Sequence, residues 1–177
     1  MQEVCYIVGA GPNGIEGYDR IPKDAHIVCC NSAILKAEEY GWEPEFWVSD
    51  HNVLKTDWFK EIYGKYPLWG SRKIASRVDV EVTWNEKPWF TRDDYAPIEG
   101  VYRGGGTIVG SVVQRCYWKN CTPILCGADM GGTTNITGLT YIEGHWIKRR
   151  NRLNNFIIEY VPHTVSLTPT TLDVPLI

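Results

Sequence analysis

The chain has 177 residues, of which 44% are hydrophobic, with a formal net charge of -3 and a pI of about 5.8. This size and apolar content predict one domain, residues 1–177, with a sizeable core. The weak acidic charge excludes the broad basic field that draws proteins onto nucleic acid, so no nucleic-acid partner is expected. No apolar stretch approaches the roughly 20 residues that span a bilayer, and the N-terminus lacks a signal-peptide pattern. We therefore expect a soluble, cytoplasmic protein without a transmembrane segment; the oligomeric state is left open.

Short apolar runs alternate with helical patterns along the chain, which is typical of βα units that feed a mainly parallel sheet. Strands are expected at residues 3–8, 25–30, 45–49, 122–126 and 163–167, and helices at 33–40, 53–63, 107–118 and 146–159. The middle, residues 65–102, mixes Trp, Pro and charged residues without a sustained period, with room for short strands near 73–75 and 80–83. The sequence predicts an α/β fold of doubly wound, Rossmann-like type, with one mainly parallel sheet and helices on both faces.

A glycine loop follows the first expected strand and consists of Gly9, Ala10, Gly11, Pro12, Asn13 and Gly14. Glycines let backbone N–H groups approach a phosphate closely, and a following helix start adds a partial positive charge. Pro12 stands where a dinucleotide fingerprint would continue into a helix, so the loop does not indicate an NAD site. We expect it to bind a nucleotide or another phosphate-bearing ligand, although the same residues also suit a tight strand-to-helix turn.

Further polar residues follow the later strands: Asn31 and Ser32, then Asp50, His51 and Asn52, and finally Asp129. Because the carboxyl ends of parallel strands meet at one edge of a sheet, these side chains could surround one ligand. Each cluster is also a suitable helix cap or turn. Gly106 and Thr107 precede the helix at 107–118 and offer either an anion-binding helix start with a hydroxyl or a hinge.

His145 is the candidate general base, since it precedes a basic segment, Lys148-Arg149-Arg150, and histidine titrates near neutrality. His26 and His163 are expected to be structural. The six cysteines mostly lie inside apolar runs, which favours reduced core thiols. The even spacing of Cys116, Cys121 and Cys126 lacks a Cys-x-x-Cys pair and a nearby histidine, so no metal site is expected there.

Taken together, the motifs resemble the bacterial CMP-sialic-acid-dependent sialyltransferases and the related domain family that includes archaeal hydroxymethyl-dihydropterin diphosphokinases. Residues 7–13 are similar to the strand and Gly-x-Gly-Pro-Ser loop of these families, and residues 127–129 to a Gly-Ile-Asp that follows a later strand. Residues 141–145 resemble the Tyr-Ile-Gly-His of the sialyltransferases, whose histidine is the proposed general base. Residues 167–172 resemble their Cys-Pro-Asn-Ser-Leu and add Thr170 and Thr171 as substrate-binding candidates.

The sialyltransferase resemblance implies a nucleotide-activated sugar of CMP type as co-substrate. The nucleotide would lie on the glycine loop, with its phosphate near Gly106 and Thr107 and its ribose and base near Asn31, Ser32 and Asp50. His145 would take the proton of the acceptor hydroxyl, and His51 and Asn52 would contact substrate.

Two alternatives stay open. The diphosphokinase branch implies ATP and a pterin as substrates, with Asp50 and Asp129 holding a magnesium ion that bridges the phosphates. The other alternative is a nucleotide-binding module without turnover. It is favoured by Gly131, which stands where the sialyltransferases carry a tyrosine near the leaving phosphate, and by the fifteen residues between Asp129 and His145, where that family has a longer lid.

Overall fold

The computed structural model describes residues 3–49, 51–70, 82–83, 107–131, 134–138 and 144–177. For residues 51, 52, 69, 70, 82, 83, 118 and 144–146 it describes the backbone alone. No helix in these ranges is long and apolar enough to cross a membrane.

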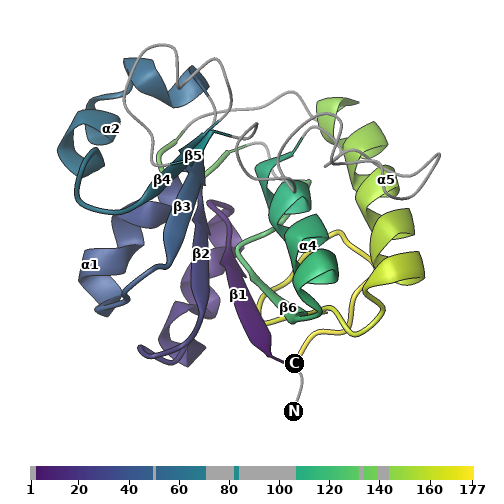
Figure 1. The fold of residues 1–177 in the computed structure, drawn as a ribbon. Coiled ribbons are helices and arrows are strands. Elements are labelled where there is room, and N and C mark those ends of the chain that lie inside the picture. Colours follow the sequence, from purple (N-terminus) through teal and green to yellow (C-terminus); the bar gives the residue numbers. More distant parts are fainter. Residues whose placement is uncertain (1–2, 50, 71–81, 84–106, 132–133, 139–143) are drawn as a thin grey trace.

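The described residues form one sheet of seven parallel strands in the order β5-β4-β3-β2-β1-β6-β7 (Figure 1). The strands are β1 (Val4–Val8), β2 (Ile27–Cys30), β3 (Phe46–Ser49), β4 (Leu68–Gly70), β5 (Val82–Thr83), β6 (Thr122–Cys126) and β7 (Val165–Ser166). The chain begins at the centre of the sheet, builds outward through β5, and then returns to add β6 on the other side of β1. The direction of winding therefore reverses between β1 and β6, which confirms the predicted doubly wound fold.

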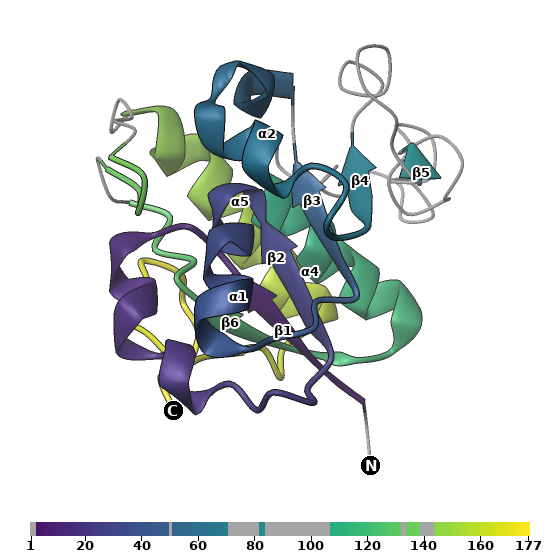
Figure 2. The same ribbon diagram turned by 90° about the vertical axis from the view of Figure 1, so that its left-hand side faces the viewer.

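Helices cover both faces of the sheet (Figures 1 and 2). One face carries the longer helices, α4 (Ile108–Lys119) and α5 (Gly144–Tyr160). The other carries shorter ones: the α-helices α1 (Lys36–Tyr40) and α2 (Asp57–Ile62), and the 3₁₀ helices η1 (Pro12–Glu16), η2 (Tyr18–Arg20), η3 (Asn31–Leu35) and η4 (His51–Lys55).

The strand residues alternate between two hydrophobic clusters, one on each face. Ile7 packs in the cluster with Val112 of α4 and Phe156 of α5, whereas its neighbour Val8 packs with Ile34 and Trp47 on the opposite face. This alternation follows from the two-residue period of a strand, and it explains why the central strands read as continuous apolar runs.

The expected elements agree with the structure apart from their ends. The helices expected at residues 33–40 and 53–63 are each divided into a 3₁₀ helix followed by a short α-helix. The strand β4 was not predicted, because three residues are too few to show a period. The strand expected at 73–75 lies outside the described residues.

Helix α4 begins at the carboxyl edge of the sheet. Thr107 caps it, since the Thr107 hydroxyl oxygen accepts a hydrogen bond from the Gly110 N–H at 3.0 Å. Because α4 leads into β6 and α5 lies between the parallel strands β6 and β7, both helices run antiparallel to the strands. Their N-termini therefore lie at the carboxyl edge of the sheet, the upper edge in Figure 1.

Candidate functional site

The loops that follow β1 and β6 are in direct backbone contact at the switch point. The Gly9 N–H donates to the Cys126 carbonyl at 2.7 Å, and the Gly11 N–H donates to the Gly127 carbonyl at 2.8 Å. A Cβ atom on Gly9 would lie 2.5 Å from the Gly127 carbonyl oxygen, and one on Gly127 would lie 2.6 Å from the Gly9 carbonyl oxygen. Gly127 also has a positive φ of 66°. The glycines are therefore needed for the approach of these two loops to each other.

Asp129 is the buried carboxylate of this contact. The Asn13 N–H donates to Asp129 Oδ2 at 3.1 Å, and the residue is only 8% exposed. Oδ1 is buried and has no hydrogen-bond partner among the described residues. It faces Gly11, where an added Cβ would lie 2.5 Å away. Burial raises the pKa of the Asp129 carboxyl, and the hydrogen bond from Asn13 opposes that shift.

The segment after β7 holds the β6 loop in place through three threonines. The Thr168 hydroxyl accepts from the Gly127 N–H at 2.9 Å, the Thr170 hydroxyl donates to the Ala128 carbonyl at 2.6 Å, and the Thr171 hydroxyl donates to the Asp129 carbonyl at 2.9 Å. The predicted substrate residues Thr170 and Thr171 thus position the backbone on either side of Asp129. Thr168 was missed, although it belongs to the same segment.

The ends of β2 and β3 meet at the same edge. Asn31 has a positive φ of 52° and accepts, through Oδ1, a hydrogen bond from the Ser49 hydroxyl at 3.2 Å. The Ser32 hydroxyl is buried and has no partner among the described residues. Asp50 lies outside the described residues, and for His51 and Asn52 only the backbone at the start of η4 is described.

The two predicted residues at helix starts also belong to this edge. Thr107 is the N-cap of α4, so the Gly110 N–H is satisfied, while the capping pattern leaves the Ile108 and Val109 N–H groups without an intrahelical acceptor. Gly106 lies outside the described residues. His145 lies in the first turn of α5, with its backbone described but not its side chain.

The glycine loop itself uses most of its N–H groups internally. The Gly9, Gly11, Asn13 and Gly14 N–H groups all donate within the protein. Few of its N–H groups are therefore free for a ligand. Helix α4 packs over β1, β2 and β6, so its first N–H groups lie at the same edge of the sheet. No group of side chains able to hold a metal ion occurs among the described residues.

These features gather at the carboxyl edge of the β1/β6 switch point, the position at which open α/β folds generally bind their ligands. The contacts join the glycine loop, Asp129 and the three threonines directly. Asn31, Thr107 and the backbone of His145 share the edge through the topology of the sheet.

No protein-family model matches the chain, and no curated protein matches its sequence. Among solved structures, the MAf glycosyltransferase from Magnetospirillum magneticum AMB-1 is similar, with a TM-score of 0.67 and 17% sequence identity over 99% of this chain. The chain spans 34% of the length of that protein. At this identity the likeness concerns the fold, and it supports the same α/β assignment.

Proposed function

We propose that this chain is the nucleotide-binding unit of a glycosyltransferase that uses a nucleotide-activated sugar. The observation that carries the proposal is the buried Asp129 carboxylate at the β1/β6 switch point, whose Oδ1 has no hydrogen-bond partner among the described residues. The similarity in fold to a glycosyltransferase over nearly the whole chain supports the same reaction class.

Asp129 would recognise the hydroxyl groups of the nucleotide ribose. A carboxylate only accepts hydrogen bonds when ionised, and it repels a phosphate, so a sugar hydroxyl is the ligand group that fits Oδ1. A buried acceptor without a donor costs about 1–3 kcal/mol. Since Oδ1 is buried beneath Gly11, the glycine loop would have to shift before a ligand hydroxyl could donate to Oδ1 and recover part of that cost.

The phosphate would lie at the start of α4. Thr107 caps this helix, and the N–H groups of Ile108 and Val109, which have no acceptor within the helix, together with the helix dipole favour an anion there. In the transfer step, negative charge grows on the phosphate oxygen as its bond to the sugar carbon breaks. Donors fixed at that position stabilise the leaving nucleotide more than the bound substrate.

His145 is the proposed general base of a sialyltransferase-like reaction with a CMP-type donor. The acceptor oxygen would attack the sugar carbon, the bond to the phosphate oxygen would break, CMP would leave, and the acceptor proton would pass to the His145 imidazole. Its backbone lies in the first turn of α5, at the same edge as Asp129, which is compatible with this role.

A thermal-shift panel tests the proposal. CMP, CDP, UDP, GDP, ATP and a pterin are each added with and without magnesium, since a ligand at 100 times its Kd should stabilise the protein by about 2.7 kcal/mol. We expect stabilisation by cytidine nucleotides without metal. Asp129→Asn should reduce the shift, and Asp19→Asn, which removes an exposed carboxylate of η2, should not.

Other outcomes of the same panel would replace the proposal. Binding of ATP and pterin only in the presence of magnesium would favour the diphosphokinase reaction. Cytidine binding without any transfer to sugar acceptors would favour a binding module. The absence of any nucleotide-dependent shift would reject all of these functions.

A further inference from the structure

Three cysteine thiols meet at the opposite, amino edge of the sheet, away from the proposed nucleotide site. Cys5 comes from β1, Cys116 from the last turn of α4, and Cys121 from the residue before β6. All three lie in the buried hydrophobic cluster between the sheet and helices α4 and α5. The other cysteines of the chain, Cys29, Cys30 and Cys126, do not belong to this cluster.

The end of α4 explains why two of these thiols meet. Asn120 adopts a left-handed conformation with a φ of 53°, the Asn120 N–H donates to the Tyr117 carbonyl at 3.1 Å, and the Cys121 N–H donates to the Cys116 carbonyl at 3.0 Å. This is a Schellman motif, in which the side chains at the positions of Cys116 and Cys121 are brought into contact.

The backbone spacing is within the range of a disulfide. A hydrogen bond of 3.0 Å between the Cys121 nitrogen and the Cys116 oxygen limits the separation of the two Cα atoms to about 7 Å at most. Disulfides span Cα separations of about 4.4–6.8 Å. Formation of a bond therefore requires little backbone movement.

A cavity borders this pair and not Cys5. It has a volume of about 130 Å³, and Cys116 and Cys121 line it together with Tyr117, Tyr160 and His163. The two cysteines are otherwise buried, with exposures of 0% and 2%. Because a water molecule takes up about 30 Å³ in the liquid, the cavity has room for a molecule of the size of hydrogen peroxide.

The electrostatic surroundings favour a thiolate on Cys121. Hydrogen bonds from the thiols of Cys116 and Cys5 lower the pKa of the Cys121 thiol, and the positive charge of Arg115 contributes in the same direction. The hydrogen bond to Cys121 raises the pKa of the Cys116 thiol. Cys121 is also the less completely buried of the two, at 2% exposure against 0% for Cys116. Since the thiolate is the nucleophilic form of cysteine, Cys121 is the expected nucleophile of the pair.

We propose that Cys121 and Cys116 form a peroxide-reactive thiol pair that closes to a reversible disulfide at the amino edge of the sheet. The Cys121 thiolate attacks one oxygen of hydrogen peroxide, the O–O bond breaks, and the departing hydroxide takes up a proton as water. The resulting sulfenic acid is attacked by the Cys116 sulfur, which forms the S–S bond and releases the second water. A small thiol reduces the disulfide again by exchange.

Peptide mapping of the full chain tests this proposal. After treatment with hydrogen peroxide and blocking of free thiols, trypsin cleaves after Arg115, Lys119 and Lys148, so Cys116 and Cys121 fall on different peptides. We expect the peptides Cys116–Lys119 and Asn120–Lys148 to be linked, with two of the six thiols lost and both regained with dithiothreitol. Cys126 lies on the second of these peptides, so the linkage should persist in Cys126→Ser.

Two substitutions separate the nucleophile from its partner. Cys116→Ser should leave a sulfenic acid on Cys121 that dimedone traps, whereas Cys121→Ser should show neither the linked peptide nor dimedone on Cys116. Retention of all six thiols in the wild-type protein, under conditions that oxidise free cysteine, would overturn the proposal. Oxidation confined to Cys29, Cys30 or Cys126 would also overturn it, and these wild-type measurements do not depend on the folding of any variant.

Discussion

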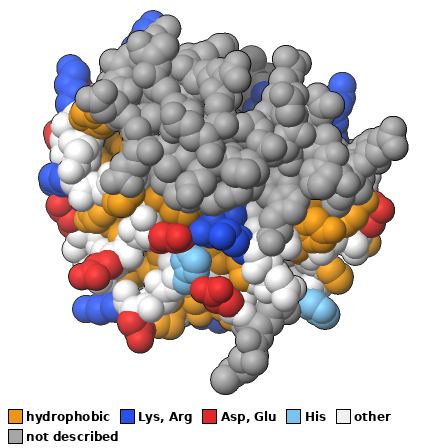
Figure 3. Space-filling view, viewed as in Figure 1, with side chains coloured by type: hydrophobic (Ala, Val, Ile, Leu, Met, Phe, Trp, Pro, Cys, Tyr) orange, Lys and Arg blue, Asp and Glu red, His pale blue; other side chains and the backbone are white. Residues whose placement is uncertain are grey.

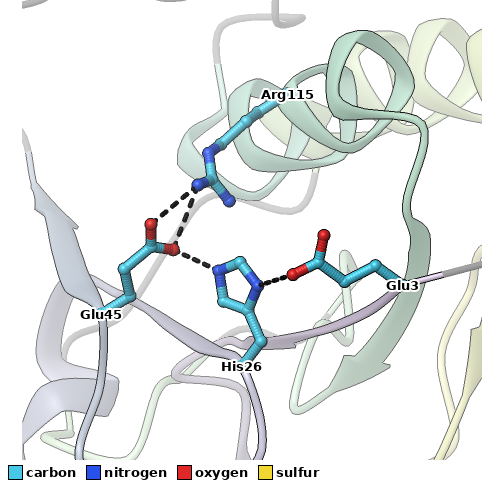
Figure 4. A network of polar contacts seen from close by, with 4 residues as sticks. All are labelled: Glu3, His26, Glu45 and Arg115. Atoms are coloured by element: carbon cyan, nitrogen blue, oxygen red, sulfur yellow. Dashed lines mark hydrogen bonds and ion pairs between the residues drawn. The ribbon is translucent and has the colours of Figure 1, made fainter.

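The carboxyl and amino edges of the sheet use polar groups in opposite ways. At the amino edge, a histidine lies between acidic side chains beside a basic group on the surface (Figure 3). His26 contacts Glu3 at 3.3 Å through Nδ1 and Glu45 through Nε2, and Arg115 of α4 donates to both oxygens of Glu45 at 3.1 Å (Figure 4). These charged side chains pair with one another across β1, β2, β3 and α4, so the network joins elements of the fold.

At the carboxyl edge, the hydrogen bonds fix the backbone and leave a buried acceptor unpaired. Hydroxyl groups of the segment 168–171 bind the backbone of the β6 loop, and Asp129 Oδ1 keeps no partner among the described residues. Buried polar atoms in native proteins are nearly always hydrogen-bonded, so an exception at a switch point suggests a ligand. The two edges thus differ in what their polar side chains contact: charged partners on neighbouring elements at the amino edge, and mainly the backbone of the β6 loop at the carboxyl edge.

The largest effect is expected from His145→Ala at the carboxyl edge. Removal of a general base typically costs about 10²–10⁴-fold in rate, so transfer should fall at least about 100-fold while nucleotide binding is kept. Steady-state kinetics and calorimetry on the same preparations measure the two quantities. His163→Ala, which removes a histidine at the amino edge, is the matched control and should retain turnover. Wild-type rates in His145→Ala would remove this residue from the mechanism.

Gly127→Ala should destabilise the protein by about 3 kcal/mol, because a left-handed alanine costs about 1–2 kcal/mol and overpacking adds about 1–3 kcal/mol. The added Cβ would lie 2.6 Å from the Gly9 carbonyl oxygen. Urea denaturation measures the loss. Gly64→Ala is the control, since Gly64 has a φ of 86° with no atom within 4 Å of an added Cβ, and it should cost about 1 kcal/mol. Equal losses in the two variants would show that loop contact contributes nothing.

Asp129→Asn should weaken nucleotide binding while raising the free energy of unfolding at pH 7 by about 1 kcal/mol. Burial raises the pKa of this carboxyl above its ordinary value of 3.8, so the folded state disfavours the charged form. The penalty is present above the raised pKa and disappears as the pH falls and the carboxyl is protonated. The stability gain of the variant should therefore vanish near pH 3 in urea titrations. A loss of stability at pH 7 would mean that Asp129 is a structural residue like those of the amino edge.

The smallest effect is expected from His26→Gln at the amino edge, about 0.5 kcal/mol. The hydrogen bond to Glu45 raises the pKa of His26 above 6.5, so its stabilisation is present below that pH and is lost as the pH rises through the raised value. Burial raises the pKa of the Glu45 carboxyl, but the hydrogen bond to His26 and the positive charge of Arg115 outweigh burial. The net result is a pKa below the ordinary value of 4.5. The advantage of the wild type over His26→Gln should thus be largest between about pH 5 and 6.5.

Nucleotide binding provides the second measurement for His26→Gln, because the substitution lies at the edge opposite the proposed site. Affinity for CMP should match that of the wild type at each pH. Weaker binding of CMP by His26→Gln would show that the amino edge is coupled to the proposed nucleotide site. The amino-edge network would then have a role beyond stabilising the fold.

The sequence by itself determined the order of most elements and the edge of the sheet at which the polar candidate residues gather. Apolar runs predicted β1, β2, β3 and β6, the glycine and the cap predicted the turn after β1 and the start of α4, and polar residues after successive strands predicted one shared edge. These signals are local, since a strand period or a helix cap involves residues within a few positions of one another.

Only the tertiary structure decided which loops meet at that edge. The Asn13 N–H and Asp129 are 116 residues apart, and their contact exists because β6 returns to pair with β1 after the chain has built the other half of the sheet. The meeting of Cys5 with Cys116 and Cys121 has the same origin at the other end of these strands. Such contacts depend on strand order and on the packing of α4 over the sheet, and no local pattern of residues encodes either of them.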